Sequence, residues 1–297
     1  MVWQSFEAAK AGTDAAKKSS VFARSCAAFL LILSAFAPLP AGAQSLKVMS
    51  FNVRLVIASD GANAWDKRRD LAVRTVADAA PDVIGTQELF KEQGDYLVAK
   101  LPHYAWIGIG RRGGDSDEHM GLFYRRDRLR ILRSGNFWFS DTPEVPGSIS
   151  WGNLYPRMVT WAEFRARGGQ RFFVFNTHFP YRAEDEAVRR RCAEFLIAKI
   201  GEIAGNARVI VTGDFNTTPD SEAHAILTRE FADAWSATKR RSGPDETFHN
   251  FTGNADRRID WILSRGFTAR SVRTVTDHDG GRYPSDHFPV LAELRAR

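Results

Sequence analysis

The stretch Val209-Ile210-Val211-Thr212-Gly213-Asp214-Phe215-Asn216 decides how this sequence is interpreted. Its consecutive β-branched apolar residues predict a buried strand that ends near the glycine. Asp214 and Asn216 follow two residues apart, so their side chains project to the same side of an extended chain. A carboxylate and an amide at the end of a buried strand form a candidate site, and polar residues at other strand ends are candidates to meet them.

Alternation and apolar runs predict roughly ten strands and four helices across the chain. We expect the strand at residues 258–263 to pair with the one at 268–276, and Asp66 and Asp220 to cap helices. The mixed order of strands and helices, without a repeat of fixed period, predicts one α/β or α+β domain. The expected strands cover residues 46–53, 82–86, 104–109, 120–124, 129–139, 158–164, 171–177, 208–213, 258–263, 268–276 and 288–294, and the helices cover 66–80, 89–100, 184–204 and a segment from 220 onward.

Residues 1–43 have the pattern of a secretory signal peptide. Lys17, Lys18 and Arg24 precede an apolar run at residues 27–37, and Ala41-Gly42-Ala43 supplies the small residues of a cleavage site. The apolar run is shorter than the roughly 20 residues that span a bilayer, so we expect no transmembrane anchor after cleavage. The prediction is a secreted or periplasmic protein whose mature domain covers residues 44–297.

The net charge and the cysteine content of the mature chain argue against a polyanion-tracking protein and against a disulfide-stabilised one. The leader holds four basic and two acidic residues, so its removal lowers the net charge from +6 to +4. This weak imbalance favours solvated basic clusters over a polyanion-tracking surface, although an electrostatic role toward an anionic substrate stays open. Cys192 is the one cysteine outside the leader, which excludes an internal disulfide in the mature chain, and we expect it to pack in the core.

The polar residues at strand ends share a preference for hard cations. Taken singly, each has an ordinary explanation as a turn, cap or loop residue. Asp260 lies between Ile259 and Trp261, where a buried carboxylate needs a partner such as the Asp286-His287 pair. Carboxylates, amides and two histidines without cysteine ligands favour Mg²⁺ or Mn²⁺ over Zn²⁺. The candidates are Asn52, Glu88, Glu118, His178, Asp214, Asn216, Asp260, Asp286 and His287.

Six motifs in order resemble the endonuclease/exonuclease/phosphatase superfamily. They extend over residues 50–290 and therefore over nearly the whole mature chain. The motifs are Ser50-Phe51-Asn52-Val53, Gln87-Glu88, Asn176-Thr177-His178, Gly213-Asp214-Phe215-Asn216, Arg258-Ile259-Asp260-Trp261-Ile262 and Ser285-Asp286-His287-Phe288-Pro289-Val290. The resemblance implies a four-layer α/β sandwich, with two packed sheets between helices and one metal-dependent site at an edge.

The resemblance also implies roles for these residues. Glu88 would be the main Mg²⁺ ligand, beside Asn52 and Asp286. His287 would act as general base or contact the phosphate, and Asp260 would fix its tautomer.

The remaining roles concern the phosphate and the nucleophile. His178 would bind the phosphate, steadied by Glu118. Asp214 and Asn216 would orient the nucleophile and the phosphate oxygens. Arg157 and Arg182 are candidate phosphate contacts, because a guanidinium suits phosphate as well as it suits structural ion pairs.

The sequence is also similar to a secreted bacterial subgroup, through residues 137–144, Trp151 and Pro156-Arg157. It departs from that subgroup at residues 179–182, where an Asp or His is expected near position 180. The predicted function is hydrolysis of a phosphodiester, or of a phosphomonoester, by metal-assisted water attack. Nucleic acid, phospholipid headgroups, and inositol or sugar phosphates stay open as substrates, and no obligate protein partner is evident.

Two other functions compete with hydrolysis. The first is an exported binding module for glycans or phospholipid headgroups on the same scaffold, which would not need a general base. The second is a membrane-active, sphingomyelinase-like enzyme, but the mature chain lacks an apolar hairpin insertion for docking on a bilayer.

Overall fold

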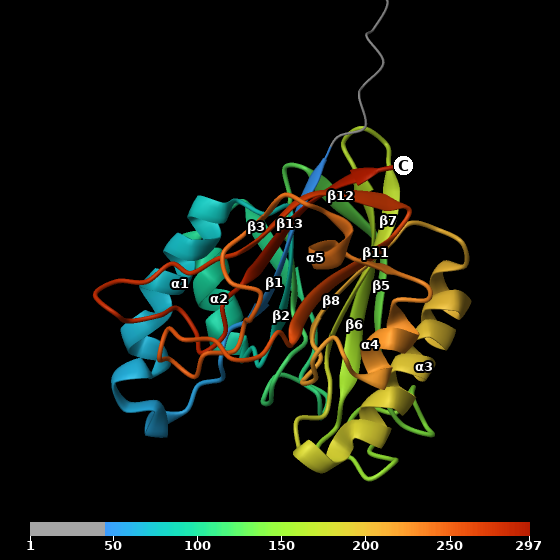
Figure 1. Ribbon diagram of the computed structural model, residues 1–297, viewed down its shortest axis with the longest axis horizontal. Helices are drawn as coiled ribbons and strands as arrows, with labels where there is room; N and C mark the ends of the chain where they lie inside the picture. The colour runs from blue at the N-terminus through green and yellow to red at the C-terminus, as the bar shows by residue number, and fades with distance from the viewer. Residues whose placement is uncertain (1–44) are drawn as a thin grey trace, which may run out of the picture. The chain divides into compact units, whose positions relative to one another are not determined.

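The computed structural model describes residues 45–297, which form two β-sheets with helices on their outer faces (Figure 1). The expected signal peptide, including Cys26, lies outside the described residues. The seven-stranded sheet has the order β10-β12-β13-β1-β2-β4-β3. Its strands are β1 (Leu46–Asn52), β2 (Val83–Gln87), β3 (Tyr104–Ile107), β4 (Leu122–Arg125), β10 (Arg241–Ser242), β12 (Phe267–Thr274) and β13 (Val290–Ala296).

The six-stranded sheet has the order β5-β6-β7-β8-β11-β9. Both sheets are mixed, because β1 and β2 run parallel in one, β7 and β8 run parallel in the other, and most other pairs are antiparallel. The strands of this second sheet are β5 (Leu129–Trp138), β6 (Met158–Ala166), β7 (Arg171–His178), β8 (Val209–Asp214), β9 (Ala232–Asp233) and β11 (Asp260–Arg265).

Three hydrophobic clusters hold the layers together. One contains apolar residues of both sheets, such as Val48 and Ile210, and fills the space between them. A second packs the six-stranded sheet against α3 (Glu186–Ala204) and α4 (Glu222–Leu227) and contains the buried Cys192. A third packs the other sheet against α1 (Trp65–Ala79) and α2 (Lys91–Lys100). This arrangement confirms the expected α/β sandwich. The helices are α1 (Trp65–Ala79), α2 (Lys91–Lys100), α3 (Glu186–Ala204), α4 (Glu222–Leu227) and α5 (Ala234–Ala237), with short 3-10 turns η1 (Ala58–Asn63) and η2 (Ala183–Asp185).

Three local predictions were wrong. Strand β12 does not pair with β11: the chain turns at Gly266, where φ is +79°, and β12 joins β13 in the other sheet. Asp66 lies in the first turn of α1, whose N-cap is Ala64. Ser221 caps α4 by accepting a hydrogen bond from His224 N, and Asp220 instead accepts one from Thr218.

A buried polar network joins the two sheets beneath their polar strand ends. The Asn176 side chain on β7 donates to the Thr86 and Gly121 carbonyls at 2.7 and 3.0 Å and accepts from Gln87 at 2.7 Å. Gly85 makes room for this network, because a Cβ there would lie 2.5 Å from Asn176 Oδ1. Apart from Gln87 Oε1, which has no partner within the described residues, the polar groups of this network are paired, and the network fixes the spacing of the sheets where the site forms.

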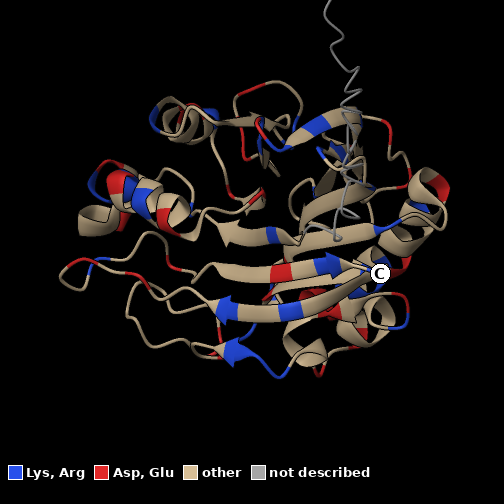
Figure 2. Cartoon of the chain, turned by 90° about the horizontal axis from the view of Figure 1, so that it is seen from above, with Lys and Arg blue, Asp and Glu red and all other residues tan. Residues whose placement is uncertain are grey.

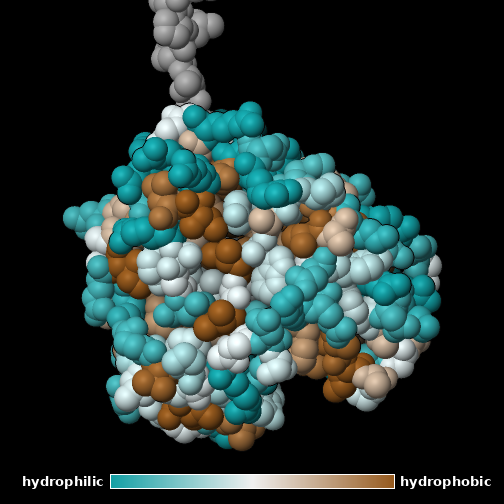
Figure 3. Space-filling model, turned by 180° about the vertical axis from the view of Figure 1, so that it is seen from behind, coloured by the Kyte–Doolittle hydropathy of each residue, from teal (hydrophilic) through white to brown (hydrophobic). Residues whose placement is uncertain are grey.

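The surface of the described residues mixes both signs of charge. Lysines and arginines alternate with acids over the strands and helices (Figure 2), which agrees with solvated basic clusters. On the face seen from behind, hydrophobic side chains form several groups separated by hydrophilic ones (Figure 3). Between residues 45 and 297, no helix is both long and apolar enough to cross a bilayer.

Candidate active site

Strand register brings the predicted residues of the six-stranded sheet together. His178 at the end of β7 is the register partner of Asp214 at the end of β8, and Asp214 is in turn the partner of Asp260 at the start of β11. The Phe215 ring stacks on Trp261 at 4.4 Å, which anchors the chain on either side of these carboxylates. Three neighbouring strands therefore present a histidine and two carboxylates at one edge of the sheet.

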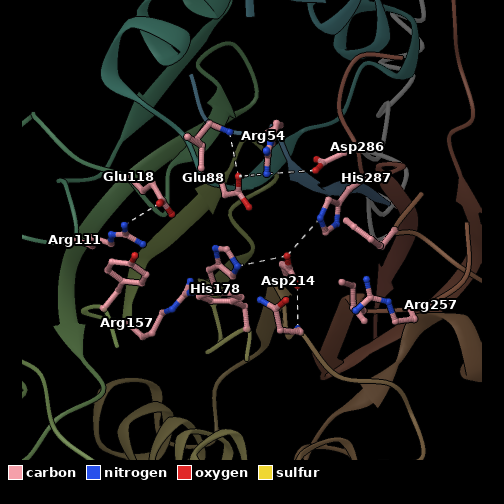
Figure 4. A pocket seen from close by; sticks show the side chains of 16 residues that line it. Arg54, Glu88, Arg111, Glu118, Arg157, His178, Asp214, Arg257, Asp286 and His287 are labelled. Atoms are coloured by element: carbon pink, nitrogen blue, oxygen red, sulfur yellow. Dashed lines mark hydrogen bonds and ion pairs between the residues drawn. The ribbon is translucent and has the colours of Figure 1, made fainter. Parts of the chain in front are cut away.

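Asp214 Oδ2 is the common neighbour of the groups that meet at this edge (Figure 4). It accepts a hydrogen bond from Asn52 Nδ2 at 3.0 Å, and it lies 3.5 Å from His178 Nε2 and 3.8 Å from His287 Nε2. Its other oxygen accepts from the backbone N–H of Asn216 at 2.9 Å. Asp214 is thus held in place from both sheets, with both predicted histidines beside the same oxygen.

His287 and Asp260 form the predicted pair. Their Nδ1 and Oδ2 atoms are 2.9 Å apart and buried, so the imidazole donates its Nδ1 proton to the carboxylate and directs Nε2 toward Asp214. Ligand atoms of Asp214, Asp260 and His287 all lie within 4.8 Å of one another. His287 Nδ1 and Asp260 Oδ2 already form a hydrogen bond with each other. The cluster of Asp214, Asp260 and His287 is therefore better suited to holding and moving a proton than to binding a metal.

The two histidines differ in charge because their surroundings differ. Burial, with Arg157 next in importance, keeps the pKa of His178 well below its usual value. Burial also disfavours charged His287, but the adjacent Asp260 and Asp214 outweigh it and raise its pKa to about 10. Burial raises the pKa of Asp214 to about 7. One neutral and one cationic histidine therefore flank a carboxyl group that titrates near neutral pH.

The seven-stranded sheet contributes a second group of carboxylates. Glu88 follows β2 with a positive φ of 58°, and its Oε2 accepts from Leu55 N at 3.1 Å. Arg54 Nη1 lies between Glu88 Oε2 at 4.0 Å and Asp286 Oδ2 at 3.6 Å. The carboxylates of Glu88 and Asp286 therefore stabilise a positive charge between them, and in this structure the Arg54 guanidinium supplies that charge.

The donor chemistry of this group suits a hard divalent ion, with one correction. Glu88 and Asp286 both offer carboxylate oxygens to the pocket, as Mg²⁺ and Mn²⁺ require. Asn52, however, is not placed as the predicted oxygen ligand. Its amide nitrogen donates to Glu88 Oε1 at 3.1 Å, and its oxygen accepts from Arg54 N at 3.0 Å, so Asn52 orients Glu88 rather than presenting an oxygen to a metal.

A pocket of about 420 Å³ opens over both groups. Arg111, Glu118 and Arg157 lie on one side of His178, and Arg257 lies on the other (Figure 4). Arg157 is 5% exposed, and its Nη1 atom has no partner within residues 45–297. A buried guanidinium with an unpaired nitrogen in a pocket wall is prepared for an anionic group of a ligand.

Two predicted residues have other partners. Glu118 does not steady His178, because its carboxylate pairs with Arg111 Nη2 at 2.9 Å, and His178 Nδ1 has no partner in the described part of the chain. Glu118 still lines the pocket, and burial raises its pKa to about 7. Arg182 is not brought to the pocket: it forms a bidentate pair with Asp185, at 3.1 and 2.6 Å. Asp185 therefore already occupies the hydrogen-bond donors that Arg182 would need to bind a phosphate.

Asn216 lines the pocket, but its side chain also has a structural contact. It donates to the Phe179 carbonyl at 3.0 Å and so ties the loop after β7 to the end of β8.

Three pocket arginines were not predicted, namely Arg54, Arg111 and Arg257. Each could have been suspected from its position, because Arg54 follows Asn52 by two residues, Arg111 lies in the glycine-rich loop, and Arg257 directly precedes the strand of Asp260.

Arg68 on α1 is another residue that the sequence did not reveal. It is fully buried, and its hydrogen bonds within the described residues go to backbone carbonyls. Its guanidinium donates to the carbonyls of Val53 at 2.6 Å, Pro284 at 2.8 Å and Arg54 at 2.8 Å. Arg68 thereby clamps the segment after Asn52 to the segment before Asp286.

We expect Arg68→Met to lower the free energy of unfolding by about 3 kcal/mol or more, since each buried carbonyl left unpaired costs about 1–3 kcal/mol. Urea unfolding followed by circular dichroism measures the change. Arg69→Met is the matched control, because Arg69 is the exposed neighbour on the same helix. If the two variants had the same free energy of unfolding, Arg68 would not hold these two segments together as described.

Comparison with known proteins agrees with this fold. Residues 49–287 match the model of the Endonuclease/Exonuclease/phosphatase family. The uncharacterized protein L388 of Acanthamoeba polyphaga mimivirus is 31% identical over 247 residues, which cover 76% of this chain and 91% of that protein. Tyrosyl-DNA phosphodiesterase 2 of Danio rerio is 25% identical over 263 residues, covering 82% of this chain and 65% of that protein.

A solved structure gives the same result. The mannosyl-6-phosphatase of Bacteroides thetaiotaomicron superimposes with a TM-score of 0.78 at 33% identity, covering 84% of this chain and 99% of the other. With the family match extending from β1 to His287, the chain belongs to the endonuclease/exonuclease/phosphatase family, a family of phosphoesterases and nucleases.

Proposed function

We propose that this chain is a divalent-metal-dependent phosphoester hydrolase. One observation carries the proposal: Asp214 Oδ2 lies within 3.8 Å of both His178 and His287, in a pocket that also contains Glu88 and Asp286. A proton acceptor, charged donors and a cation-binding carboxylate pair thus face the same space.

Glu88 and Asp286 would hold the metal, with Mg²⁺ as the first candidate and Mn²⁺ as the second. A bound ion of this kind supplies a Lewis acid that neutralises charge on a phosphate oxygen. Asn52 keeps Glu88 oriented for this task through its 3.1 Å hydrogen bond.

The other side chains of the pocket would transfer the proton and bind the phosphate. Asp214 accepts a proton from water as the water oxygen bonds to phosphorus. The leaving oxygen is protonated from solvent when the phosphorus–oxygen ester bond breaks, and Asp214 then returns its proton to solvent. His287, held by Asp260, donates a charge-assisted hydrogen bond to a phosphate oxygen, as does Arg157. His178 offers Nε2 to the same phosphate. The products are an alcohol and phosphate, or a phosphomonoester if the substrate is a diester.

A sugar phosphate is the substrate that we propose to test first. A relative of 33% identity is a mannosyl-6-phosphatase, and the pocket wall beside Arg157 combines Arg111, Glu118 and Tyr155, whose charged and hydroxyl groups suit a hydroxylated leaving group. Tyrosyl-DNA phosphodiesterase 2 keeps nucleic-acid diesters among the candidates. We further propose export, on the basis of the leader pattern in residues 1–43.

A substrate panel with Mg²⁺ and with EDTA tests the function. We expect hydrolysis of at least one of mannose 6-phosphate, inositol phosphates, phospholipids, DNA and RNA, measured as inorganic phosphate from a monoester or as the phosphomonoester product from a diester. We also expect a loss of at least about 100-fold in rate with EDTA, because the metal contributes several kcal/mol. Undiminished turnover in EDTA would exclude the metal mechanism. Binding of glycans or headgroups without any turnover would instead favour the binding module.

A further inference from the structure

The rings of Tyr155 and Tyr181 line the pocket, and the proposed reaction gives these rings no role. Their centroids are 6.5 Å apart and their planes are inclined by 21°, so the two rings are nearly parallel. The Arg111 guanidinium lies 4.8 Å from the centroid of Tyr155, and the Arg157 guanidinium lies 5.9 Å from that of Tyr181. We call these four residues the tyrosine wall. It places aromatic surface next to Arg157, which would bind the phosphate.

The Tyr181 ring is exposed, although its backbone is held in place. Tyr181 is 53% exposed, whereas Arg189 on α3 is 5% exposed. Arg189 Nη1 donates to the carbonyls of Pro180 at 3.0 Å and Arg182 at 2.8 Å, on either side of Tyr181. A half-exposed ring adds little to core packing, and a ring on a fixed backbone loses little conformational entropy when it binds a ligand. The Tyr181 ring is therefore suited to contact a bound molecule.

Arg182 ties together the two segments that carry the tyrosines. Its Nη2 atom donates to the Gly152 carbonyl at 2.8 Å, while Asp185 holds the same guanidinium. Gly152 precedes Tyr155 by three residues, so this contact fixes the loop of Tyr155 against the segment of Tyr181. Arg182 therefore supports the tyrosine wall from behind instead of binding the phosphate.

The charges in the pocket favour a ligand with a single phosphate. Three of the pocket arginines already pair with carboxylates, namely Arg54 with Asp60 at 2.9 Å, Arg111 with Glu118 at 2.9 Å and Arg257 with Asp256 at 3.2 Å. Arg157 is different, because its buried Nη1 atom has no partner within residues 45–297. A nucleic acid brings one phosphate per nucleotide and gains affinity from a free cation at each, whereas a sugar phosphate uses one.

We propose that the tyrosine wall binds the ring of a hexose phosphate, with the sugar packed on the Tyr181 ring while Arg157 holds the phosphate. The inference rests on the proposed function, which places the phosphate beside Arg157. One face of a pyranose ring consists largely of C–H groups, which pack on an aromatic ring as other apolar surfaces do. The sugar hydroxyl groups need polar partners, and the Glu118 carboxylate lies on the same side of His178 as Arg157 (Figure 4). An acyclic leaving group such as glycerol lacks the C–H face.

Ligand-observed NMR titrations in EDTA test this site by binding alone. They measure the dissociation constants of mannose 6-phosphate and of glycerol 3-phosphate. We expect wild-type protein to bind mannose 6-phosphate about tenfold more tightly, the size of effect typical of an aromatic ring contact. Tyr181→Ala should remove this preference and leave the affinity for glycerol 3-phosphate within about twofold of wild type, because Arg157 still binds the phosphate.

Two further variants separate the ring from the rest of the surface. Tyr181→Phe keeps the ring without its hydroxyl group and should keep the preference for mannose 6-phosphate. Leu154→Ala is the matched control, since Leu154 is exposed on the same loop as Tyr155 and does not line the pocket. Circular dichroism checks each fold, and Tyr181→Leu, which lacks an aromatic face, replaces Tyr181→Ala if that variant does not fold.

Three results would overturn the proposal: equal wild-type affinity for the two ligands, an unchanged preference in Tyr181→Ala, or a thymidine dinucleotide that binds more tightly than mannose 6-phosphate and depends on Tyr181. A wild-type chain that hydrolyses a substrate of the panel without preferring the sugar ring removes this inference and leaves the proposed function standing. A chain that prefers the sugar ring through Tyr181 but hydrolyses nothing with Mg²⁺ or Mn²⁺ removes the proposed hydrolysis and leaves the tyrosine wall as a sugar-binding surface.

Discussion

Replacing Asp214 with asparagine is expected to lower kcat by about 10²- to 10⁴-fold, the usual contribution of a positioned general base. The variant keeps the shape of the side chain and an oxygen for the Asn216 N–H, but it cannot accept a proton from water. Steady-state hydrolysis of the best substrate of the panel measures the effect, and circular dichroism checks that the fold is retained.

Two further variants separate proton transfer from general damage to the site. Asp220→Asn is the matched control, since Asp220 is exposed and does not line the pocket, and we expect wild-type kcat. His287→Ala is expected to lower kcat by about 10²- to 10³-fold, because the variant lacks a hydrogen-bond donor to the phosphate. If Asp214→Asn retained kcat within threefold of wild type, another group would have to accept the proton.

The second large effect is expected for Glu88→Gln. The substitution removes the negative charge that Mg²⁺ or Mn²⁺ requires but keeps the size of the side chain, and we expect Mn²⁺ affinity to fall about 100-fold or more, beyond the 10- to 100-fold typical of residues that only orient ligands. Isothermal titration calorimetry with Mn²⁺ measures the affinity, and the rate of substrate hydrolysis at saturating and limiting Mg²⁺ shows whether added metal restores the rate.

Glu92→Gln is the control for this measurement, because Glu92 is exposed on α2 only four residues away. Unchanged Mn²⁺ affinity in Glu88→Gln would assign the metal to other ligands. The cluster of Asp214, Asp260 and His287 would then be the next candidate, since its ligand atoms lie within 4.8 Å of one another.

The sequence predicted that polar residues at the ends of separate strands lie together, because this arrangement depends on the regular geometry of a sheet. Once β7, β8 and β11 are neighbours, register alone places His178, Asp214 and Asp260 side by side. The pairing of His287 with Asp260 followed from the cost of burying a lone carboxylate. These inferences used general rules that hold along the whole length of a strand.

The errors concern contacts that the pattern of a sequence does not encode. The orientation of the Asn52 amide depends on the backbone N–H of Arg54, and the partner of Glu118 depends on how the 110–118 loop folds back to place Arg111 beside it. The sheet that β12 joins depends on one turn at Gly266. Arg182 is different, because its partner Asp185 lies three residues away and local spacing could have revealed it.

The pairing of β1 with β13 has a consequence for the synthesis of the chain. Ser50 in β1 is the register partner of Val290 in β13, and β13 also separates β1 from β12 in the sheet. While the ribosome is still translating the earlier codons, β1 has no antiparallel neighbour and the Asp286-His287 segment has not yet been made. Such long-range pairing slows folding, and the candidate site cannot be assembled until β13 and the Asp286-His287 segment have been synthesised.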